Sequence, residues 1–381
     1  MSKLNERGNS KLKFMDKYIG IPLIFMLGLF RKKKKELQRN PQNIVIVMIA
    51  AIGDTILLSA IIKELKLLFP NVAITLVCSK GNIQAAKNLP QVDHMIKFDM
   101  ANVLGSFFLL RKLPEYDLLF DFGTWAKFNA FISFVIKANF KVGFKRKSMY
   151  RHYIYDCITE HIDELHEIEN YRNLVRALGH RLLSLDPEFK VSSENSQWLN
   201  PKRKYVVFHM FASGSHKMKK EWPKKLWFEL AQRLMEEGYT IILTGGKEDK
   251  EQAEAFVQLI GGFQCFSLAG KVSLEETAAV IKEVGAIITV NTGVMHLAAV
   301  MDAYIVALHG PTSPERWGPV TKKSVILTPN IKCDQLLSLG FEKHQCVLED
   351  GCISTIQVDD VFEAMKKVEI GEHFVKTSSI L

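Results

Sequence analysis

The stretch that decides the fold is Ala286-Ile287-Ile288-Thr289-Val290-Asn291-Thr292-Gly293-Val294-Met295-His296-Leu297-Ala298-Ala299. Its apolar, β-rich part stops at Asn291-Thr292-Gly293, where a helix is predicted to start. A second apolar run follows and ends in Gly310-Pro311-Thr312. Backbone N–H groups at a helix start carry partial positive charge and favour phosphate. The stretch therefore predicts a phosphorylated ligand at the carboxyl edge of a parallel sheet.

The same alternation of apolar runs and helical spacing occurs in two halves of the chain. In the first half it predicts strands at 43–51, 72–77, 92–98 and 116–121 and a helix at 55–69. After the polar stretch 192–197 it predicts strands at 205–210 and 240–244 and helices at 223–238 and 274–282. Short connections of this kind predict parallel sheets. We expect two α/β domains, 41–192 and 200–365, that face each other across a ligand-binding cleft.

The positive charge is concentrated in an N-terminal arm. Residues 1–40 carry 11 of the 50 Lys and Arg but only 3 of the 41 Asp and Glu, so they hold +8 of the net charge of +9. The nearly neutral remainder argues against nucleic-acid binding. Within the arm, 13 uncharged residues, 18–30, precede Arg31-Lys32-Lys33-Lys34-Lys35. Because a spanning helix needs about 20 residues, we expect the arm to lie on an anionic membrane surface. A helix packed on the protein's own surface is the alternative.

Cysteine usage indicates a reducing compartment. The six cysteines are too few for a disulfide scaffold, so a cytoplasmic setting is expected. The spacing of Cys333, His344, Cys346 and Cys352 does not match paired zinc knuckles, and no metal site is predicted there.

Asp54 follows Gly53 at the turn from the first predicted strand to the first helix. As a general base, its carboxylate would accept the proton of an acceptor hydroxyl during group transfer. As a structural residue, it would cap the helix, since Asp is among the favoured N-caps. The spacing alone leaves both readings open.

A small-residue loop with lysines follows the strand at 205–210. Ser213 and Gly214 would let the backbone approach a phosphate, and Lys220 would offset the charge of a departing diphosphate. A flexible, solvated lysine loop is the alternative. His296 has two readings as well, a ligand of the same diphosphate or an ordinary core or capping histidine.

Several nucleotide-binding signatures are absent from the sequence. It has no D-x-D pair, no G-x-x-x-x-G-K-[ST] loop, no G-x-G-x-x-G after a strand and no G-x-S-x-G elbow. These absences count against metal-dependent nucleotide-sugar enzymes, P-loop hydrolases, dinucleotide dehydrogenases and α/β-hydrolases.

Four stretches, in this order, resemble glycosyltransferase family 9, the bacterial lipopolysaccharide heptosyltransferases. They are Gly53-Asp54-Thr55 through Phe69-Pro70, Lys220-Glu221-Trp222-Pro223, Gly270-Lys271-Val272-Ser273-Leu274-Glu275, and Asn291 to Ala299 with Gly310-Pro311-Thr312. The resemblance runs from about residue 43 to 365. It implies a GT-B fold, with the donor bound mainly by the second domain. It also implies a metal-independent, inverting transfer from a nucleotide-diphosphate sugar, usually ADP-heptose, to a lipid-linked acceptor.

The resemblance also implies roles for individual residues. Asp54 would be the base, Lys220 would bind donor phosphate, and Thr292 and Gly293 would offer backbone amides to the diphosphate. Lys271 would lie near the nucleotide. The sequence departs from the family at Asn291, where the family has Asp, and at Ala60, where it has Pro. No cofactor besides the donor substrate is implied.

The arm fits this resemblance, because the acceptor would lie in the inner leaflet of the inner membrane. The protein is then expected to be cytoplasmic and peripheral on that membrane. A basic run in the first domain would meet acidic acceptor groups or form a solvated loop; it comprises Lys141, Lys145, Arg146, Lys147 and Arg151. The alternatives are a GT-B transferase of another nucleotide sugar, for O-antigen or capsule, and a non-catalytic glycan- or lipid-binding relative.

Overall fold

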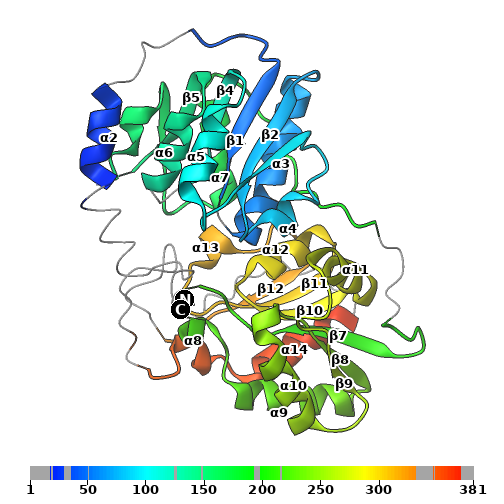
Figure 1. Ribbon diagram of the computed structural model, residues 1–381. Coiled ribbons are helices and arrows are strands. Elements are labelled where there is room, and N and C mark those ends of the chain that lie inside the picture. The colour runs from blue at the N-terminus through cyan, green and yellow to red at the C-terminus, as the bar shows by residue number, and fades with distance from the viewer. Residues whose placement is uncertain are drawn as a thin grey trace. The chain divides into compact units, whose positions relative to one another are not determined.

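The computed structural model describes residues 18, 20–29, 36–49, 51–123, 127–146, 149–192, 198–214, 217–331, 346 and 348–369. The chain divides into two compact units, Met1–Phe189 and Lys190–Leu381. Each unit contains a six-stranded sheet covered by helices (Figure 1). The predicted α/β class with two Rossmann-like domains is confirmed.

The first unit has the strand order β3-β2-β1-β4-β5-β6, with every pair parallel. The strands are β1 (Asn43–Val47), β2 (Ala73–Ser79), β3 (His94–Phe98), β4 (Tyr116–Asp121), β5 (Ala138–Lys145) and β6 (Cys157–Glu160). Val45, Val47 and Leu119 on the central strands are completely buried, which explains their continuous apolar runs. The direction of strand addition reverses between β1 and β4.

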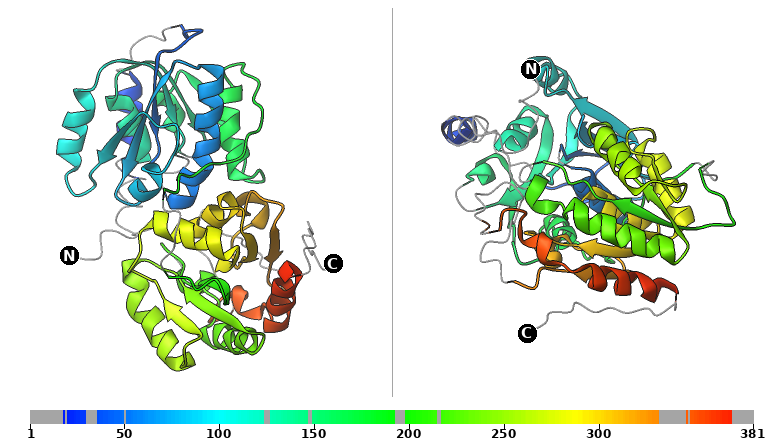
Figure 2. Two further views of the ribbon diagram at one scale, coloured as in Figure 1. Left: turned by 90° about the vertical axis from the view of Figure 1, so that its right-hand side faces the viewer. Right: turned by 90° about the horizontal axis from the view of Figure 1, so that it is seen from below.

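Helices cover both faces of this sheet. Figure 2 (left) shows the cyan α5 on one side and the blue α3 and green α7 on the other. The helices of the sheet region are α3 (Ile52–Leu68), α4 (Ile83–Ala86), α5 (Val103–Arg111), α6 (Lys127–Val135) and α7 (Glu167–Arg176), with a 3₁₀ turn η1 (Arg151–Ile154). Because α3 and α7 pack against each other, residues far apart in sequence meet beside the end of β1.

The described part of the N-terminal arm includes helix α2 (Gly20–Leu29), which packs on α6 and η1. Its Ile24 is fully buried among apolar residues of α6, of η1 and of the residue after η1, which are Ala130, Phe131, Phe134, Ile154 and Tyr155. The alternative of a helix packed on the protein's own surface therefore holds for one face of α2. The other face exposes Phe25, Met26 and Leu29. The basic run 31–35 lies outside the described residues.

None of the described helices combines the length and the apolar character that crossing a bilayer would require.

The second unit has the order β12-β11-β10-β7-β8-β9, again with every pair parallel. The strands are β7 (Lys204–His209), β8 (Tyr239–Leu243), β9 (Cys265–Ser267), β10 (Ala286–Val290), β11 (Tyr304–Leu308) and β12 (Ser324–Leu327). The reversal falls between β7 and β10, where Ile287 pairs with Val207 and Thr289 with His209. The two sheets thus share one topology.

The main core of the second unit lies between its sheet and α9 (Lys224–Glu236), α10 (Lys250–Ile260) and α14 (Val358–Glu369). Trp222 and Trp227 meet edge to face in this core, with ring centroids 5.3 Å apart. Helices α11 (Leu274–Val284) and α12 (Gly293–Val300) pack against each other and against β7, β10 and β11. The short elements are α8 (Lys217–Lys220), η2 (Lys247–Asp249), α13 (Pro314–Trp317) and η3 (Cys352–Thr355).

Candidate active site

Each sheet has a switch point, where neighbouring strands continue into loops that diverge to opposite sides. Ligands of open parallel sheets bind in the crevice beyond the carboxyl ends of strands at this point. Asp54 follows β1 at the switch point of the first unit. Asn291, Thr292 and Gly293 follow β10 at the switch point of the second, beside the loop that leaves β7. Both predicted motifs therefore lie where this topology places ligands.

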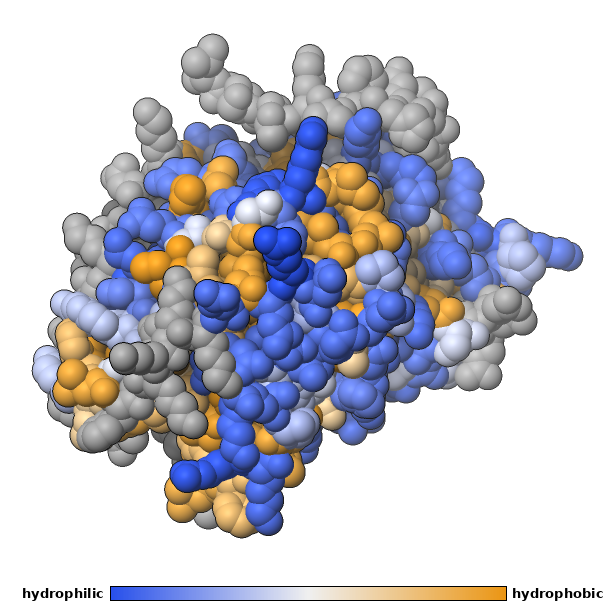
Figure 3. Space-filling model, turned by 90° about the horizontal axis from the view of Figure 1, so that it is seen from above, coloured by the Kyte–Doolittle hydropathy of each residue, from blue (hydrophilic) through white to orange (hydrophobic). Residues whose placement is uncertain are grey.

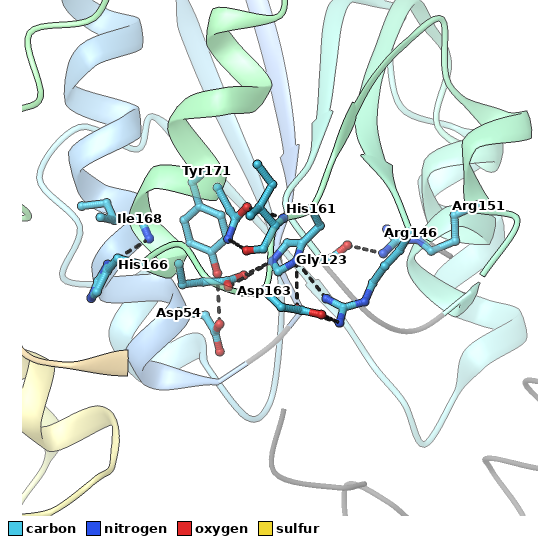
Figure 4. Close-up of polar contacts among 12 residues, drawn as sticks. Asp54, Gly123, Arg146, Arg151, His161, Asp163, His166, Ile168 and Tyr171 are labelled. Carbon is cyan, nitrogen blue, oxygen red and sulfur yellow. Dashed lines mark hydrogen bonds and ion pairs between the residues drawn. The ribbon is translucent and has the colours of Figure 1, made fainter. Parts of the chain in front are cut away.

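Asp54 lies in the first turn of α3, one residue after Gly53. The N-cap of this helix is Ala51, and the helix begins at Ile52 rather than near Thr55. The reading of Asp54 as the cap is therefore wrong. The partial positive charge of the helix start favours the ionised carboxylate. The Tyr171 hydroxyl, from α7, donates a hydrogen bond of 3.0 Å to Oδ1 of Asp54 (Figure 4).

A buried ion pair lies at the end of β4, the strand next to β1. Asp121 and Arg151 are both fully buried, with Nη2 of Arg151 2.9 Å from Oδ2 of Asp121. Further donors to the Asp121 carboxylate are the Gly123 amide, the Ser133 hydroxyl and the Tyr155 hydroxyl. Burial lowers the pKa of Arg151, but the nearby Tyr155 and Asp121 outweigh it, so the pKa is raised overall and the guanidinium stays charged.

The contacts of the basic run 141–151 correct its reading as a solvated loop. Lys141 donates to the carbonyls of Ser133, Phe134 and Ile136, so it caps the end of α6. Arg146 contacts Asp163 with Nη2 at 2.7 Å from each carboxylate oxygen, and Lys145 pairs with Glu160. Each described member of the run thus has a partner within the fold, so the solvated-loop reading is wrong for them, and contact with acidic acceptor groups stays a prediction. Lys147 lies outside the described residues.

The contact with Arg146 also assigns the tautomer of the buried His161 (Figure 4). Its Nη1 lies 2.8 Å from Nδ1 of His161, and arginine can only donate, so Nδ1 accepts. The proton of the ring must then sit on Nε2, which is 3.1 and 3.2 Å from the two carboxylate oxygens of the buried Glu167. The His166 ring accepts the Ile168 amide and caps α7. These contacts hold the start of the helix that carries Tyr171.

In the second unit, α12 begins with backbone groups suited to an anion. Its N-cap Thr292 is extended, and no side chain of the described residues caps the helix start. The Thr292 hydroxyl oxygen is buried and has no hydrogen-bond partner among them. The Asn291 side-chain amide donates to the Thr312 hydroxyl at 2.7 Å. This contact joins the loop after β10 to the loop after β11. The uncapped start leaves amides available to phosphate oxygens.

The lysine loop after β7 is fixed by specific contacts. Ser213 and Gly214 are exposed, and Lys220 Nζ donates to the Ser213 carbonyl at 2.6 Å. Lys219 donates to the carbonyls of Leu348 and Glu349. Lys217 Nζ lies 2.9 Å from Asp249. The described lysines are therefore positioned around the loop, and the reading as a flexible, solvated loop is wrong for them. Ser215 lies outside the described residues.

Two buried histidines at the same sheet edge escaped the sequence reasoning. His209 ends β7 and contacts the Thr244 hydroxyl at 3.0 Å, and His309 follows β11. Burial lowers the pKa of each to about 4, so both are neutral at physiological pH. The signal that singled out Asp54, a polar residue at the end of a buried strand, would also have found them and Asp121. No local signal points to Tyr171.

Of the two remaining predicted residues, Lys271 lies apart from this centre, whereas His296 lies one turn into α12. Lys271 follows β9, three strands away from β10, and contacts the Ser267 carbonyl and Glu254. His296 is only 4% exposed on α12, which agrees with the core-histidine alternative. A direct contact of either with a donor stays a prediction.

Among the residues that the structure describes, no group of three His, Cys, Asp or Glu side chains gathers as a metal site. Cys333 and His344 lie outside those residues. Cys346 and Cys352 are free thiols.

Comparisons with known proteins identify a family model, curated relatives and solved structures that are similar to this chain. The family model for glycosyltransferase family 9 (heptosyltransferase) matches residues 109–340. Lipooligosaccharide heptosyltransferase 2 of Haemophilus influenzae is 25% identical over 307 residues, which cover 75% of this chain and 88% of that protein. Two solved structures share the GT-B fold. The E. coli ADP-heptose LPS heptosyltransferase II is 22% identical, with a TM-score of 0.69 over 86% of this chain and 98% of that one. The glycosyl transferase family 9 protein of Veillonella parvula is 20% identical, with a TM-score of 0.72 over 89% and 100%.

Proposed function

The chain belongs to glycosyltransferase family 9, the heptosyltransferases, and we propose that it transfers heptose from ADP-heptose to a lipid-linked acceptor of lipopolysaccharide synthesis. The observation that carries this proposal is the position of the two motifs. A carboxylate follows the first strand of one Rossmann-like sheet, and an uncapped helix start follows the corresponding switch point of the other. The reaction needs one group to take a proton and another to receive a diphosphate.

The second unit would bind the donor. The amides at Thr292 and Gly293, the Ser213–Gly214 loop and Lys220 would surround the diphosphate. Lys271, three strand spacings or about 14 Å from β10, would face the nucleoside end. ADP-heptose stands in the name of the similar E. coli enzyme, which supports the choice of nucleotide.

The first unit would bind the acceptor and supply the base. Asp54 would take the proton of the acceptor hydroxyl while its oxygen attacks the anomeric carbon from the face opposite the diphosphate. The bond from that carbon to the diphosphate oxygen breaks, and ADP leaves with the electron pair. Lys220 and the α12 amides would stabilise the negative charge that develops there. We propose that these groups fill the role of a divalent metal.

Asn291 favours a second candidate, a GT-B transferase that uses another nucleotide sugar. Its amide carries no charge and is already engaged with Thr312, so it would meet sugar hydroxyls differently from a carboxylate. Thermal stabilisation by ADP, UDP, GDP and CMP would separate the candidates. Stabilisation by UDP but not by ADP would reject the heptose donor.

We also propose that the protein is cytoplasmic and binds the inner membrane peripherally through its arm. The exposed apolar residues of α2 directly precede five basic residues in the sequence, a combination that suits anionic lipid. Tyr150 and Tyr153 add aromatic rings 5.4 and 4.8 Å from Phe25. The top view in Figure 3 shows apolar surface scattered among hydrophilic residues rather than one broad patch. We propose that membrane contact involves these side chains of α2 and their aromatic neighbours.

Replacing Asp54 with Asn tests the assigned base. We expect turnover with ADP-heptose and a membrane extract to fall by about 10²–10⁴-fold, while ADP still raises the melting temperature. Asp302→Asn is a matched control, because Asp302 is exposed and its left-handed backbone (φ 59°) also suits Asn. Unchanged turnover in Asp54→Asn would reject Asp54 as the base. Loss of turnover in EDTA, restored by manganese, would reject the metal-independent mechanism.

A further inference from the structure

The hydrogen bond between Tyr171 and Asp54 joins residues 117 positions apart in sequence. Tyr171 belongs to α7, and Asp54 to the first turn of α3. In Figure 4 the phenol oxygen points directly at the carboxylate. A carboxylate can only accept, so the tyrosine hydroxyl is the donor.

The phenol ring has little freedom to move. Tyr171 is 1% exposed, and its ring meets Phe122 edge to face, with centroids 5.4 Å apart and an interplanar angle of 78°. Phe122 follows Asp121 and stacks on Phe120 of β4. One residue before Tyr171, Asn170 binds both the amide and the carbonyl of Ile162, at 2.9 and 2.8 Å. The hydroxyl is thus held at one place beside the switch point.

We propose that Tyr171 is a positioning residue for the reaction, acting through the carboxylate of Asp54. This proposal rests on the proposed role of Asp54 as the base. A donor fixed on Oδ1 favours one rotamer of the aspartate, which orients the second oxygen for the incoming proton. The same hydrogen bond stabilises the ionised form, so the base is deprotonated over a wider pH range. The hydrogen bond thus orients the Asp54 carboxylate but makes it a somewhat weaker base.

Tyr171→Phe removes the hydroxyl and keeps the ring in its packing. We expect kcat to fall about tenfold, with KM for ADP-heptose changed less than twofold, because the donor would bind to the other unit. The loss of a donor to the ionised carboxylate should raise its pKa. The acid limb of the pH profile of kcat should therefore move to higher pH, by about one unit. A merely structural role would not move this limb.

Two further variants distinguish a positioning role of Tyr171 from a structural role and from an error in the proposed base. Phe98→Leu loosens a buried aromatic cluster of the same unit that does not include Tyr171, so it should lower the melting temperature and leave the acid limb in place. If Asp54→Asn retains turnover, the proposed base is wrong and the role of Tyr171 is lost with it. If Asp54→Asn is inactive while Tyr171→Phe keeps the wild-type kcat and acid limb, Asp54 remains the base and the positioning role alone is refuted.

Discussion

Replacing Arg151 with Met should destabilise the first unit strongly. The methionine side chain would occupy the fully buried site of Arg151. Asp121, which is also fully buried, would be left without its cationic partner. Three hydrogen-bond donors to Asp121 remain, but none carries a charge. Breaking a buried pair by removing one partner costs about 3–5 kcal/mol. In a unit of this size, 1 kcal/mol shifts the melting temperature by about 2–4 °C, so a decrease of roughly 10 °C is expected.

Differential scanning calorimetry would measure this decrease, and the double variant Arg151→Met with Asp121→Asn provides the control. Asn has the shape of Asp but no charge, so the double variant should recover much of the lost stability. The reasoning would be refuted if the single variant lost less than about 1 kcal/mol, or if the double variant were less stable than the single one.

Burial holds the pKa of His209 and His309 near 4, below the 6.5 of an exposed histidine, so the unfolded chain takes up protons first as the pH falls. The free energy of unfolding that these histidines contribute above pH 6.5 should therefore decline towards pH 4, by about 3 kcal/mol for each histidine. Urea unfolding followed by tryptophan fluorescence would measure this at pH 7.5 and at pH 4.5. Equal urea midpoints at the two pH values would contradict the prediction. At the membrane, Phe25→Asp with Leu29→Asp should weaken cosedimentation with anionic vesicles severalfold, whereas Leu67→Asp, a similarly exposed site on α3, should not. Equal effects of both variants would argue against α2 as the contact.

Local sequence patterns predicted many of the strands and helices, but they missed some strands in each unit. The run 116–121 was predicted with the bounds that β4 has, because its centre, Leu118 to Phe120, is a continuous apolar run buried on both faces. Strands β5 and β6 of the first unit and β9 and β12 of the second were not predicted. Strand β5 mixes lysines with apolar residues, and the other three have only three or four residues, too few to show a period. Charge misled in the same region, because Arg151 looked like part of a solvent-exposed run and is completely buried.

The sequence by itself determined the α/β class, the helix start at Thr292 and Gly293, and the position of Asp54 after the first strand. These features depend on residues close together in the chain, where the hydrophobic period and the small residues that end a strand or start a helix can be recognised. Only the tertiary structure decided that Tyr171 contacts Asp54, that Asn291 contacts Thr312, and that Arg151 pairs with Asp121. Such contacts join segments between 21 and 117 residues apart, and they follow from how strands and helices pack, which no local pattern encodes.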